Sequence, residues 1–448
     1  MAKRIVILGS GESGTGAAIL AKRKGFDVFV SDKGQIKDNY KNKLIEEKIE
    51  FEEGQHSYDK IFSADEIIKS PGIQEKFEVM KKVRERKIPV VGEIEFAWRY
   101  CEGKVVAITG SNGKSTCTSL TYNLLNKAGM NVAIGGNIGK SFAELIANGN
   151  HEYYVLEISN FQLDDVITFK PFISVLLNIT PDHLDSYEYK FEKYIASKMK
   201  IIMNQNEGDY FIYNADDPVI ISELEKLNPN NNHPKSVSFT LNDRSGEGGW
   251  ISNNTLNIQI NQNKFSMTIN ELALQGKHNQ YNSMAAAIAG KVLGIKNETI
   301  RESMTDFHTL EHRLEFVNKV HGISFINDSK ATNVNSAWFA LESQNHPVIW
   351  IVGGIDKGND YSLITDLVKK KVKAIVCLGE NNTKIHEAFS KLVDIIVNTE
   401  SMKESVEMAY RLGNNGDVVL LSPACASFDL FENYEDRGNQ FKARVREL

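Results

Sequence analysis

The sequence predicts an α/β protein of three domains in series, each built on a largely parallel sheet. Three observations predict this class. A strand and a glycine turn open the chain at Arg4–Gly14, a second such pair stands at Val105–Thr118, and strands alternate with helices throughout the last third. Alternation of this kind is typical of parallel sheets. The 448 residues exceed one ordinary core, and the predicted domains are residues 1–101, 102–306 and 307–448.

The composition is that of a soluble globular protein. The net charge is −6, and the apolar and charged shares are 42% and 25%. No dense basic run supplies the phosphate attraction that dominates nucleic-acid binding. No apolar stretch has the length of a signal peptide or a membrane span, and the four cysteines form no CxxC pair. We therefore expect a cytoplasmic protein that binds neither nucleic acid nor membranes. We also expect a monomer, which these observations do not determine.

The first domain opens with a nucleotide-binding pattern. A predicted strand at Arg4–Leu8 leads into Gly9–Gly14, which matches G-x-G-x-x-G, and then into a predicted helix at Ala17–Lys24. A second strand, Asp27–Ser31, ends at Asp32, about 20 residues after the glycines. This is the dinucleotide fingerprint of a Rossmann-like domain, with the acid placed to bind a ribose or a base. The same geometry would hold the diphosphate of any nucleotide, so NAD remains only one of the alternatives.

A further strand and turn, Ile67–Ile73, complete the sequence pattern of this domain. Ser70 stands where that strand ends, and its hydroxyl can donate toward a ligand at the carboxyl edge of the sheet. The predicted helix Glu93–Tyr100 and the segment Cys101–Gly103 then indicate a junction with the second domain.

The second domain begins with a phosphate-binding loop. Val105–Ile108 is a short apolar strand, Thr109–Gly113 is a tight turn, and Lys114 opens a helix. Backbone N–H groups at such a helix start point at an anion, the lysine adds positive charge, and Ser115 or Thr116 offers a hydroxyl to Mg²⁺. The match is to the shorter G-x-x-G-K-[ST]-T, because the longer P-loop pattern needs a further upstream glycine. ATP binding is the favoured interpretation.

Three polar residues follow predicted strands of the same sheet. Asn137 lies in the glycine turn Gly135–Gly139, and Glu157 lies near the end of the apolar strand Tyr153–Ser159. A buried carboxylate is costly unless it is paired or bound to metal, which favours a Mg²⁺ ligand over an exposed acid at Glu157. His183 lies between two aspartates beyond the next strand, at the edge where ligands bind in open α/β sheets.

The remainder of the second domain carries weaker signals. Lys198, in the predicted helix Tyr187–Ile202, has the composition of an ordinary surface lysine. Short alternating runs at Ser236–Thr240, Leu256–Ile260 and Phe265–Ile269 predict antiparallel strands added to the parallel sheet.

A helix rich in small residues, Tyr281–Leu293, closes the second domain. Asn279 and Asn282 at its start could reach a base edge, and helix capping and packing explain them equally well. In the third domain, strands are predicted at Gly322–Asn327, Pro347–Val352, Ala374–Leu378 and Asp417–Leu421.

These turns, taken in order, resemble the Mur ligases of peptidoglycan synthesis over essentially the whole chain. The motifs that carry the resemblance are TGSNGKST, GGNIG, EISNFQLD, TPDHLD, GKHNQYN, HRLE and NDSKATN. The stretch LLSPACASFDLFENYEDRG (Leu420–Gly438) is similar to the members that add D-glutamate. The resemblance implies an ATP-dependent amide ligase that joins D-glutamate to UDP-N-acetylmuramoyl-L-alanine through an acyl phosphate. Its partners would then be these small molecules.

The resemblance also assigns binding residues. The UDP-substrate residues would be Ser13, Asp32, Lys33, Ser70, Asn137, Ser159 and His183. The ATP residues would be Gly110, Ser111, Asn112, Gly113, Lys114, Ser115, Thr116, Asn279, Asn282, Arg313 and Asp328. The D-glutamate residues would be Thr332, Lys357, Ser427, Phe428 and Tyr434. Lys33 departs from the family pattern, in which a smaller polar residue is common.

Metal and catalytic roles follow from the same resemblance. Two Mg²⁺ ions are expected, the first held by Ser115 and Glu157 and the second by His183. Lys198 matches the lysine that is carbamylated in the family, and a carbamate would supply the anionic oxygens that hard cations prefer. The residues expected at the reaction itself are Lys114, His183, Lys198 and Lys330.

Three alternatives remain open from the sequence. A sister amide ligase of the same family would add another amino acid, which Leu420–Gly438 argues against. An NAD-linked oxidoreductase built on Gly9–Gly14 leaves the phosphate-binding loop unexplained. A nucleotide switch without catalysis would leave Glu157 and His183 without a purpose.

Overall fold

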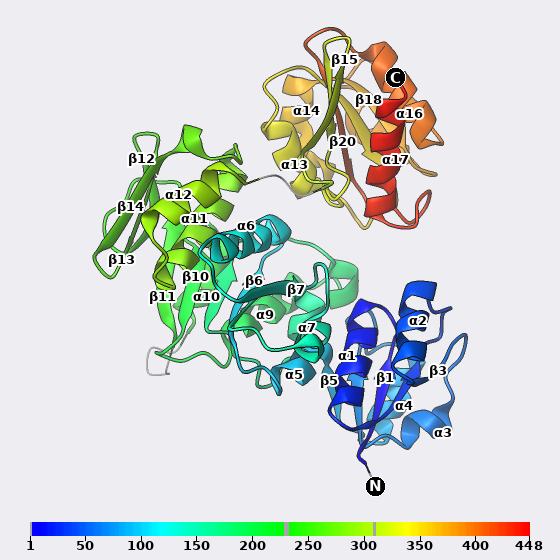
Figure 1. Ribbon diagram of the computed structural model, residues 1–448. Coiled ribbons are helices and arrows are strands. Elements are labelled where there is room, and N and C mark those ends of the chain that lie inside the picture. The colour runs from blue at the N-terminus through cyan, green and yellow to red at the C-terminus, as the bar shows by residue number, and fades with distance from the viewer. Residues whose placement is uncertain (1, 228–232, 308–310) are drawn as a thin grey trace. The chain divides into compact units, whose positions relative to one another are not determined.

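The computed structural model describes residues 2–227, 233–307 and 311–448. It contains three separate sheets, each combined with helices, and this confirms the predicted α/β class (Figure 1). The first two sheets belong to one compact unit, which ends at Phe307 and excludes Leu274–His278. The third sheet belongs to a second unit, which comprises Leu274–His278 and the described residues after Phe307. Each unit is described by itself below.

The N-terminal sheet is parallel throughout and has the order β3-β2-β1-β4-β5. Its strands are β1 (Arg4–Leu8), β2 (Asp27–Ser31), β3 (Glu50–Glu52), β4 (Glu66–Lys69) and β5 (Val90–Gly92). Its helices are α1 (Glu12–Arg23), α2 (Asp38–Glu46), α3 (Tyr58–Phe62), α4 (Glu78–Glu85) and α5 (Glu93–Trp98). Helix α1 begins five residues earlier than predicted, because Gly14 and Gly16 lie inside its first turns and allow close packing there.

The central sheet has the order β14-β13-β12-β11-β10-β9-β6-β8-β7. Its strands are β6 (Lys104–Thr109), β7 (Val132–Gly136), β8 (Tyr153–Glu157), β9 (Ile173–Leu176), β10 (Tyr210–Asn214), β11 (Lys235–Thr240), β12 (Gly248–Ser252), β13 (Thr255–Ile260) and β14 (Asn263–Thr268). Its helices are α6 (Lys114–Lys127), α7 (Phe142–Asn148), α8 (Asn160–Asp164), α9 (Phe191–Met199), α10 (Pro218–Glu225), α11 (Lys277–Val292) and α12 (Asn297–Thr305). Short 3₁₀ turns η1 (Leu184–Tyr187), η2 (Lys200–Ile202) and η3 (Ile269–Glu271) complete it, so the predicted helix Tyr187–Ile202 is divided into three elements.

The prediction of antiparallel strands in this sheet is correct for β13 and β14 and wrong for β11. Strand β11 pairs parallel with β10, because helix α10 carries the chain back across the sheet between them. The strands β12, β13 and β14 are antiparallel hairpins. Their two-residue turns, Asn253–Asn254 and Asn261–Gln262, have positive φ at both positions, the geometry that suits tight hairpins.

The third sheet has the order β15-β16-β20-β17-β18-β19, with only the β15–β16 pair antiparallel. Its strands are β15 (Glu315–Val320), β16 (Ile323–Asn327), β17 (Val348–Gly353), β18 (Val372–Leu378), β19 (Ile396–Thr399) and β20 (Val418–Ala424). Its helices are α13 (Val334–Glu342), α14 (Thr365–Lys371), α15 (Thr383–Phe389), α16 (Met402–Leu412) and α17 (Tyr434–Arg446), with a 3₁₀ turn η4 (Tyr361–Ile364). The four predicted strands are present. Helices α13–α15 pack on one face of the sheet and α16 and α17 on the other.

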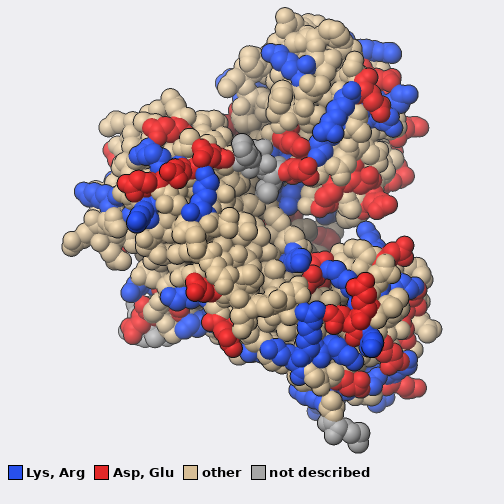
Figure 2. All heavy atoms as spheres, in the orientation of Figure 1, with Lys and Arg blue, Asp and Glu red and all other residues tan. Residues whose placement is uncertain are grey.

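The surface mixes charges of both signs. On the face that Figure 2 shows, lysine and arginine side chains alternate with aspartate and glutamate over the N-terminal sheet and its helices. Among the described residues, no helix is both long and apolar enough to cross a membrane.

Candidate active site

The phosphate-binding loop lies at the carboxyl end of β6, between β8 and β9. Gly110 and Gly113 have positive φ values of 156° and 84°, which favour glycine. A Cβ on Gly110 would lie 3.1 Å from Leu177 Cβ, so the loop is also tightly packed. The Lys114 Nζ donates to the Gly110 and Ser111 carbonyl oxygens at 2.9 and 2.8 Å. The turn therefore forms a cradle at the start of α6, with an ammonium beside it.

Two residues that the sequence interpretation missed hold this loop. The Asn178 side chain accepts from the Asn112 N–H at 2.8 Å and donates to the Asn112 carbonyl at 3.0 Å. The Tyr194 hydroxyl lies 2.9 Å from the Ser111 hydroxyl. Asn178 lies two residues beyond β9, and a polar residue just after an apolar strand is the sequence signal that could have identified it. Nothing in the sequence pattern marked Tyr194.

Glu157 is the last residue of β8, and it is paired in register with Ile108 of β6. It is 1% exposed, as expected from its apolar strand. The Asn137 side-chain amide donates to Glu157 Oε1 at 2.7 Å, and the Asn137 N–H donates to the Glu157 carbonyl at 2.8 Å. A hydrogen-bonded amide of this kind orients a carboxylate ligand. Glu157 and the buried Ser115 hydroxyl are oxygen donors at the phosphate loop, a set that fits Mg²⁺.

Lys198 is not a surface lysine, and that interpretation is wrong. Its side chain is 0% exposed, and Nζ donates to the Gly110 carbonyl at 2.9 Å and lies 4.7 Å from the Tyr194 ring centroid. Burial, reinforced by the positive Lys114, lowers the pKa of Lys198 well below its usual value, against the opposing charges of Asp182, Asp164 and Glu157. Burial thus favours the unprotonated amine, which is the form that can act as a nucleophile.

His183 lies beyond β9, at the start of η1. Its backbone adopts the left-handed region, with φ of 52°, and its N–H donates to Asp182 Oδ1 at 2.9 Å. The His183 ring packs edge-on against Phe161, at 5.2 Å between centroids, and its Nε2 lies 3.8 Å from Asp182 Oδ2. The left-handed residue turns the chain sharply, which orients the ring toward Phe161.

In the N-terminal sheet, the predicted nucleotide loop is held by two of the predicted substrate residues. Asp32 Oδ2 accepts from the N–H and the hydroxyl of Ser10, both at 2.7 Å. The Ser70 hydroxyl donates to the Gly9 carbonyl at 3.2 Å. Lys33 is exposed beside Asp32. These residues shape the loop, and their contact with substrate stays a prediction, as does that of Ser13 in the first turn of α1.

The glycine at position 14 is expected to be essential to this loop. A Cβ on Gly14 would overlap the Gly9 carbonyl oxygen, whereas a Cβ on Gly11 would meet no atom within 4 Å. We expect Gly14→Ala to lower the unfolding free energy by about 2 kcal/mol. The KM for the nucleotide-linked substrate should rise as well, because the loop must shift. Denaturant titration and steady-state kinetics measure both, with Gly11→Ala as the matched control. Equal changes in unfolding free energy and KM for the two variants would contradict the requirement for glycine at position 14.

Ser159 is engaged within its own helix start. It is the N-cap of α8 and forms a capping box with Gln162. Asn282 is fully buried in α11, its Nδ2 lies 3.4 Å from Asn279 Oδ1, and its own Oδ1 has no hydrogen-bond partner among the described residues. A buried oxygen without a hydrogen-bond partner could accept from the amine of a bound base. Helix packing also explains why Asn282 is buried, so both interpretations of this residue remain open.

The predicted residues of the third sheet meet at the carboxyl ends of β16 and β20. Asp328 is buried and accepts from the Ser422 hydroxyl at 2.9 Å and from the Leu314 N–H at 3.2 Å. Burial raises the pKa of Asp328 to about 7, although Arg313 opposes the shift. The Lys330 Nζ lies 5.1 Å from the Tyr434 ring centroid.

The remaining predicted D-glutamate residues differ in exposure. Ser427 is buried, Thr332 is half-buried, Lys357 is exposed, and Phe428 is 67% exposed. An exposed aromatic ring and an exposed lysine are available to a ligand, but nothing within this unit fixes their contacts.

Arg437 of α17 is a residue that the sequence interpretation did not single out. It is 1% exposed, and its guanidinium donates to the Ser329 hydroxyl and carbonyl at 3.0 and 2.8 Å and to the Cys425 carbonyl at 3.2 and 3.3 Å. Burial lowers its pKa to about 10, so the group stays charged at neutral pH. The Ser329 hydroxyl donates in turn to the Tyr434 carbonyl at 2.8 Å. One buried arginine thus joins the three segments that carry Lys330, Ser427 and Tyr434.

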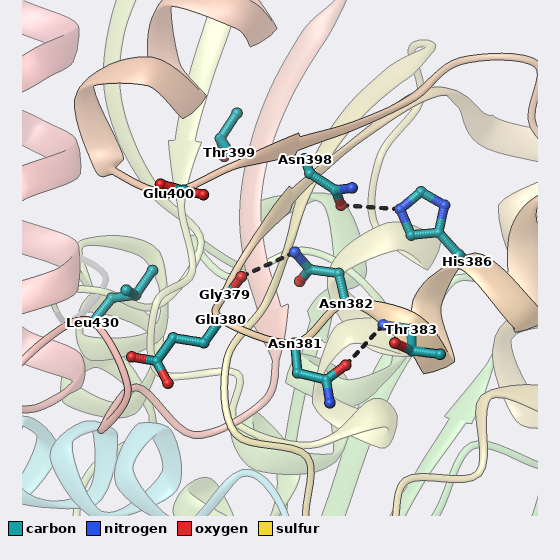
Figure 3. A pocket seen from close by; sticks show the side chains of 10 residues that line it. All are labelled: Gly379, Glu380, Asn381, Asn382, Thr383, His386, Asn398, Thr399, Glu400 and Leu430. Atoms are coloured by element: carbon teal, nitrogen blue, oxygen red, sulfur yellow. Dashed lines mark hydrogen bonds between the residues drawn. The ribbon is translucent and has the colours of Figure 1, made fainter.

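A hollow of about 750 Å³ lies elsewhere in this unit, where β18 and β19 end (Figure 3). Its lining residues are Gly379, Glu380, Asn381, Asn382, Thr383, His386, Asn398, Thr399, Glu400 and Leu430. None of them was predicted as a site residue. Most of its amides are engaged within the wall: Asn382 donates to the Gly379 carbonyl, Asn381 accepts from the Thr383 N–H, and Asn398 pairs with His386 (Figure 3).

The structure therefore gathers one set of predicted residues around the phosphate loop and another around the β16 and β20 ends. Across residues 2–227, 233–307 and 311–448, no three His, Cys, Asp or Glu side chains are grouped to hold a metal ion. The predicted Mg²⁺ ligands do not form such a group, because they combine a serine, a glutamate, a histidine and a modified lysine.

Known protein families match the chain along almost all of its length. The MurD N-terminal domain matches residues 4–79, the Mur ligase middle domain residues 108–290, and the Mur ligase, glutamate ligase domain residues 312–425. The crystal structure of the UDP-N-acetylmuramate-alanine ligase MurC from Thermotoga maritima has the same fold, with a TM-score of 0.65, 18% identity and 100% coverage of both chains. The chain belongs to the Mur ligase family.

Within that family, the chain is similar to curated UDP-N-acetylmuramoylalanine–D-glutamate ligases. It is 55% identical over 448 residues to the ligase of that name from Christiangramia forsetii, with 100% of each chain covered. It is 50% identical over 447 residues to the one from Bacteroides fragilis, again with 100% of each covered. The predicted family resemblance is confirmed, and the oxidoreductase alternative finds no support.

Proposed function

We propose that this protein joins D-glutamate to UDP-N-acetylmuramoyl-L-alanine in an ATP-dependent reaction of peptidoglycan precursor synthesis. The observation that carries the proposal is the phosphate loop with Glu157 and the buried Lys198 beside it, whose pKa burial lowers, in a chain half identical to ligases of that name. We propose a cytoplasmic monomer, since its substrates are soluble small molecules.

The reaction begins with activation of a carboxylate, which is by itself a poor electrophile. The γ-phosphoryl group of ATP moves to an oxygen of the alanyl carboxylate, which forms an acyl phosphate and releases ADP. The amine of D-glutamate then attacks the acyl carbon, and the tetrahedral intermediate expels inorganic phosphate. The proton of the amine must leave before the amide is complete. Lys114 at the phosphate loop and Lys330 in the third sheet would supply positive charge to the moving phosphoryl group.

Two Mg²⁺ ions would neutralise charge on the phosphates when bound. Ser115 and Glu157 would hold the first, with Glu157 oriented by Asn137. His183 and a carbamylated Lys198 would hold the second. Carbamylation needs an unprotonated amine that attacks CO₂ and then loses a proton, and the lowered pKa of Lys198 supports this modification.

ATP binding is proposed for the loop Gly110–Thr116, with Asn279 and Asn282 near the adenine, Arg313 at a phosphate and Asp328 at the ribose. D-glutamate binding is proposed for Thr332, Lys357, Ser427, Phe428 and Tyr434. A lysine such as Lys357 would select a side-chain carboxylate over a neutral side chain, because only the carboxylate forms a charge-assisted hydrogen bond with its ammonium.

The test is phosphate release by the purified protein with ATP, Mg²⁺ and UDP-N-acetylmuramoyl-L-alanine. We expect release that requires D-glutamate and that falls by at least about a thousandfold when L-glutamate, D-aspartate or L-lysine replaces it. Release with another amino acid instead would make the protein a sister ligase of the family. No release with any amino acid, together with intact ATP binding, would favour the nucleotide switch.

A further inference from the structure

Two buried glutamates of helix α5 join the N-terminal sheet to elements of the central sheet within one compact unit. Glu93 and Glu95 are each 2% exposed. Glu93 Oε1 accepts from the Ala143 N–H at 2.6 Å, at the start of α7. Glu95 accepts from the N–H groups of Ile167, Thr168 and Phe169 at 2.8–3.0 Å, in the turn after α8. The same helix therefore anchors two different segments.

Glu12, in helix α1, also binds the start of helix α7. It opens α1, directly after the nucleotide loop, and its Oε1 accepts from the Ser141 N–H at 3.1 Å. Helices α1 and α7 approach so closely here that a Cβ on Gly16 would overlap the Ser141 hydroxyl. The N–H groups of Ser141, the N-cap of α7, and of Ala143, in its first turn, have no helical carbonyl to bind, and two glutamate side chains from the N-terminal sheet region accept from them.

The segment before α7 is the glycine turn that carries Asn137. Gly136 and Gly139 have positive φ, and the Gly136 N–H donates to the Lys140 carbonyl at 2.9 Å, which closes the turn. Glycine-rich turns are ordered only at a cost in backbone entropy, so their ends must be fixed. Strand β7 fixes one end, and the start of α7, held by Glu12 and Glu93, fixes the other.

Asn137 in this turn orients Glu157 through the two hydrogen bonds at 2.7 and 2.8 Å described above. A continuous path of contacts therefore runs from Glu12 and Glu93 through α7 and the turn to the proposed Mg²⁺ ligand. We propose that Glu12 and Glu93 are positioning residues that set the Asn137 turn and, through it, the carboxylate of Glu157. This inference rests on the metal site of the proposed function.

The test uses Mg²⁺ and ADP as probes and needs no turnover. The Mg²⁺ concentration for half-maximal ADP binding is measured by calorimetry in the full-length protein. We expect Glu12→Ala and Glu93→Ala each to raise it about tenfold, the size of effect typical of residues that support a metal ligand. Glu93→Gln keeps an acceptor oxygen for Ala143 and should stay within about twofold of the wild type.

Glu95→Ala is the matched control for Glu93→Ala. It lies on the same short helix with the same burial, but the turn that it holds carries no predicted site residue, so its Mg²⁺ midpoint should not move. Glu12 is only half-buried, so Glu12→Ala decides the question if Glu93→Ala fails to fold. An unchanged midpoint in a folded Glu12→Ala or Glu93→Ala protein would overturn the proposal. An equal shift of the Mg²⁺ midpoint in Glu95→Ala would also overturn it, since that indicates a general loosening of the fold.

A pH titration gives a second, independent readout. Burial raises the pKa of Glu93 to about 8 from its ordinary value of 4.5, with Glu12 facing it; Glu144 and Lys43 face Glu12 in turn. Because the folded protein binds this proton more tightly, the contribution to stability is present below pH 4.5 and is lost as the pH rises to about 8. Relative to the wild type, Glu93→Gln should therefore gain stability over that range, and a constant difference would contradict the burial of the carboxyl group.

These measurements separate the inference from the proposed function. If the wild type binds ADP with Mg²⁺ but releases no phosphate with any amino acid, the ligase proposal fails. The positioning role of Glu12 and Glu93 is still tested by the Mg²⁺ midpoints. If phosphate release is normal and the Mg²⁺ midpoint is unmoved in the variants, only the positioning role fails.

Discussion

Lys198→Met is expected to reduce phosphate release by about a thousandfold, the size of loss typical when one charge-stabilising group is removed from an active site. Methionine keeps the length and apolar stem of the lysine, so packing around Tyr194 should be preserved. It cannot form a carbamate, and the oxygens proposed for the second Mg²⁺ are then missing. Steady-state kinetics measure the loss, and ADP binding confirms that the phosphate loop is intact.

Lys193→Met on the same helix provides the control, because Lys193 is exposed and pairs with Glu188 on the surface. It should leave activity unchanged. The carbamate itself is detectable by carbon-13 NMR after equilibration with labelled bicarbonate, and removal of CO₂ should lower activity reversibly. A Lys198→Met protein within about tenfold of the wild type would refute the assigned role.

Arg437→Met should disable the use of D-glutamate without abolishing ADP binding. The substitution removes the donors to Ser329 and Cys425, so the segments that carry Lys330, Ser427 and Tyr434 lose their common anchor. Each buried carbonyl left without a donor costs about 1–3 kcal/mol. We expect the unfolding free energy to fall by about 2 kcal/mol and the KM for D-glutamate to rise by about tenfold or more.

Arg444→Met, on the exposed side of the same helix, is the matched control, because it loses only a surface pair with Glu447. Arg437→Lys separates the contribution of the positive charge from that of the hydrogen bonds made by the guanidinium. A lysine keeps the positive charge, but its single ammonium cannot reach both Ser329 and Cys425 as the guanidinium does. If Arg437→Met lowers stability while the KM for D-glutamate is unchanged, the arginine only stabilises the fold.

Much of the site could be predicted because its residues lie at turns with strict local requirements. Gly110, Gly113 and Lys114 are recognisable from the sequence alone, because a phosphate-binding loop needs glycines that adopt positive φ and a cation at the start of a helix. Glu157 could be predicted as buried from its apolar strand alone, and it is. Strand β11 was wrongly predicted to be antiparallel, because its parallel pairing depends on β10 and α10, and neither element was among those predicted.

The burial of individual polar side chains could not be predicted from the sequence. In composition, the sequence around Lys198 is that of an ordinary surface helix. Only the packing of α9 against the phosphate loop places the Lys198 amine at the Gly110 carbonyl. Arg437 and Glu93 are equally ordinary in sequence. Glu93 becomes a structural anchor through Ala143, 50 positions away, and Arg437 through Ser329, 108 positions away.

The sequence by itself determined the α/β class, the two glycine loops and the family resemblance, because these depend on local backbone geometry and on motifs read in order. The tertiary structure alone decided which ionisable side chains are buried, which loops they join and which lysine has a lowered pKa. Charge state and anchoring depend on the desolvation and hydrogen bonds that distant segments supply, and no local pattern encodes those.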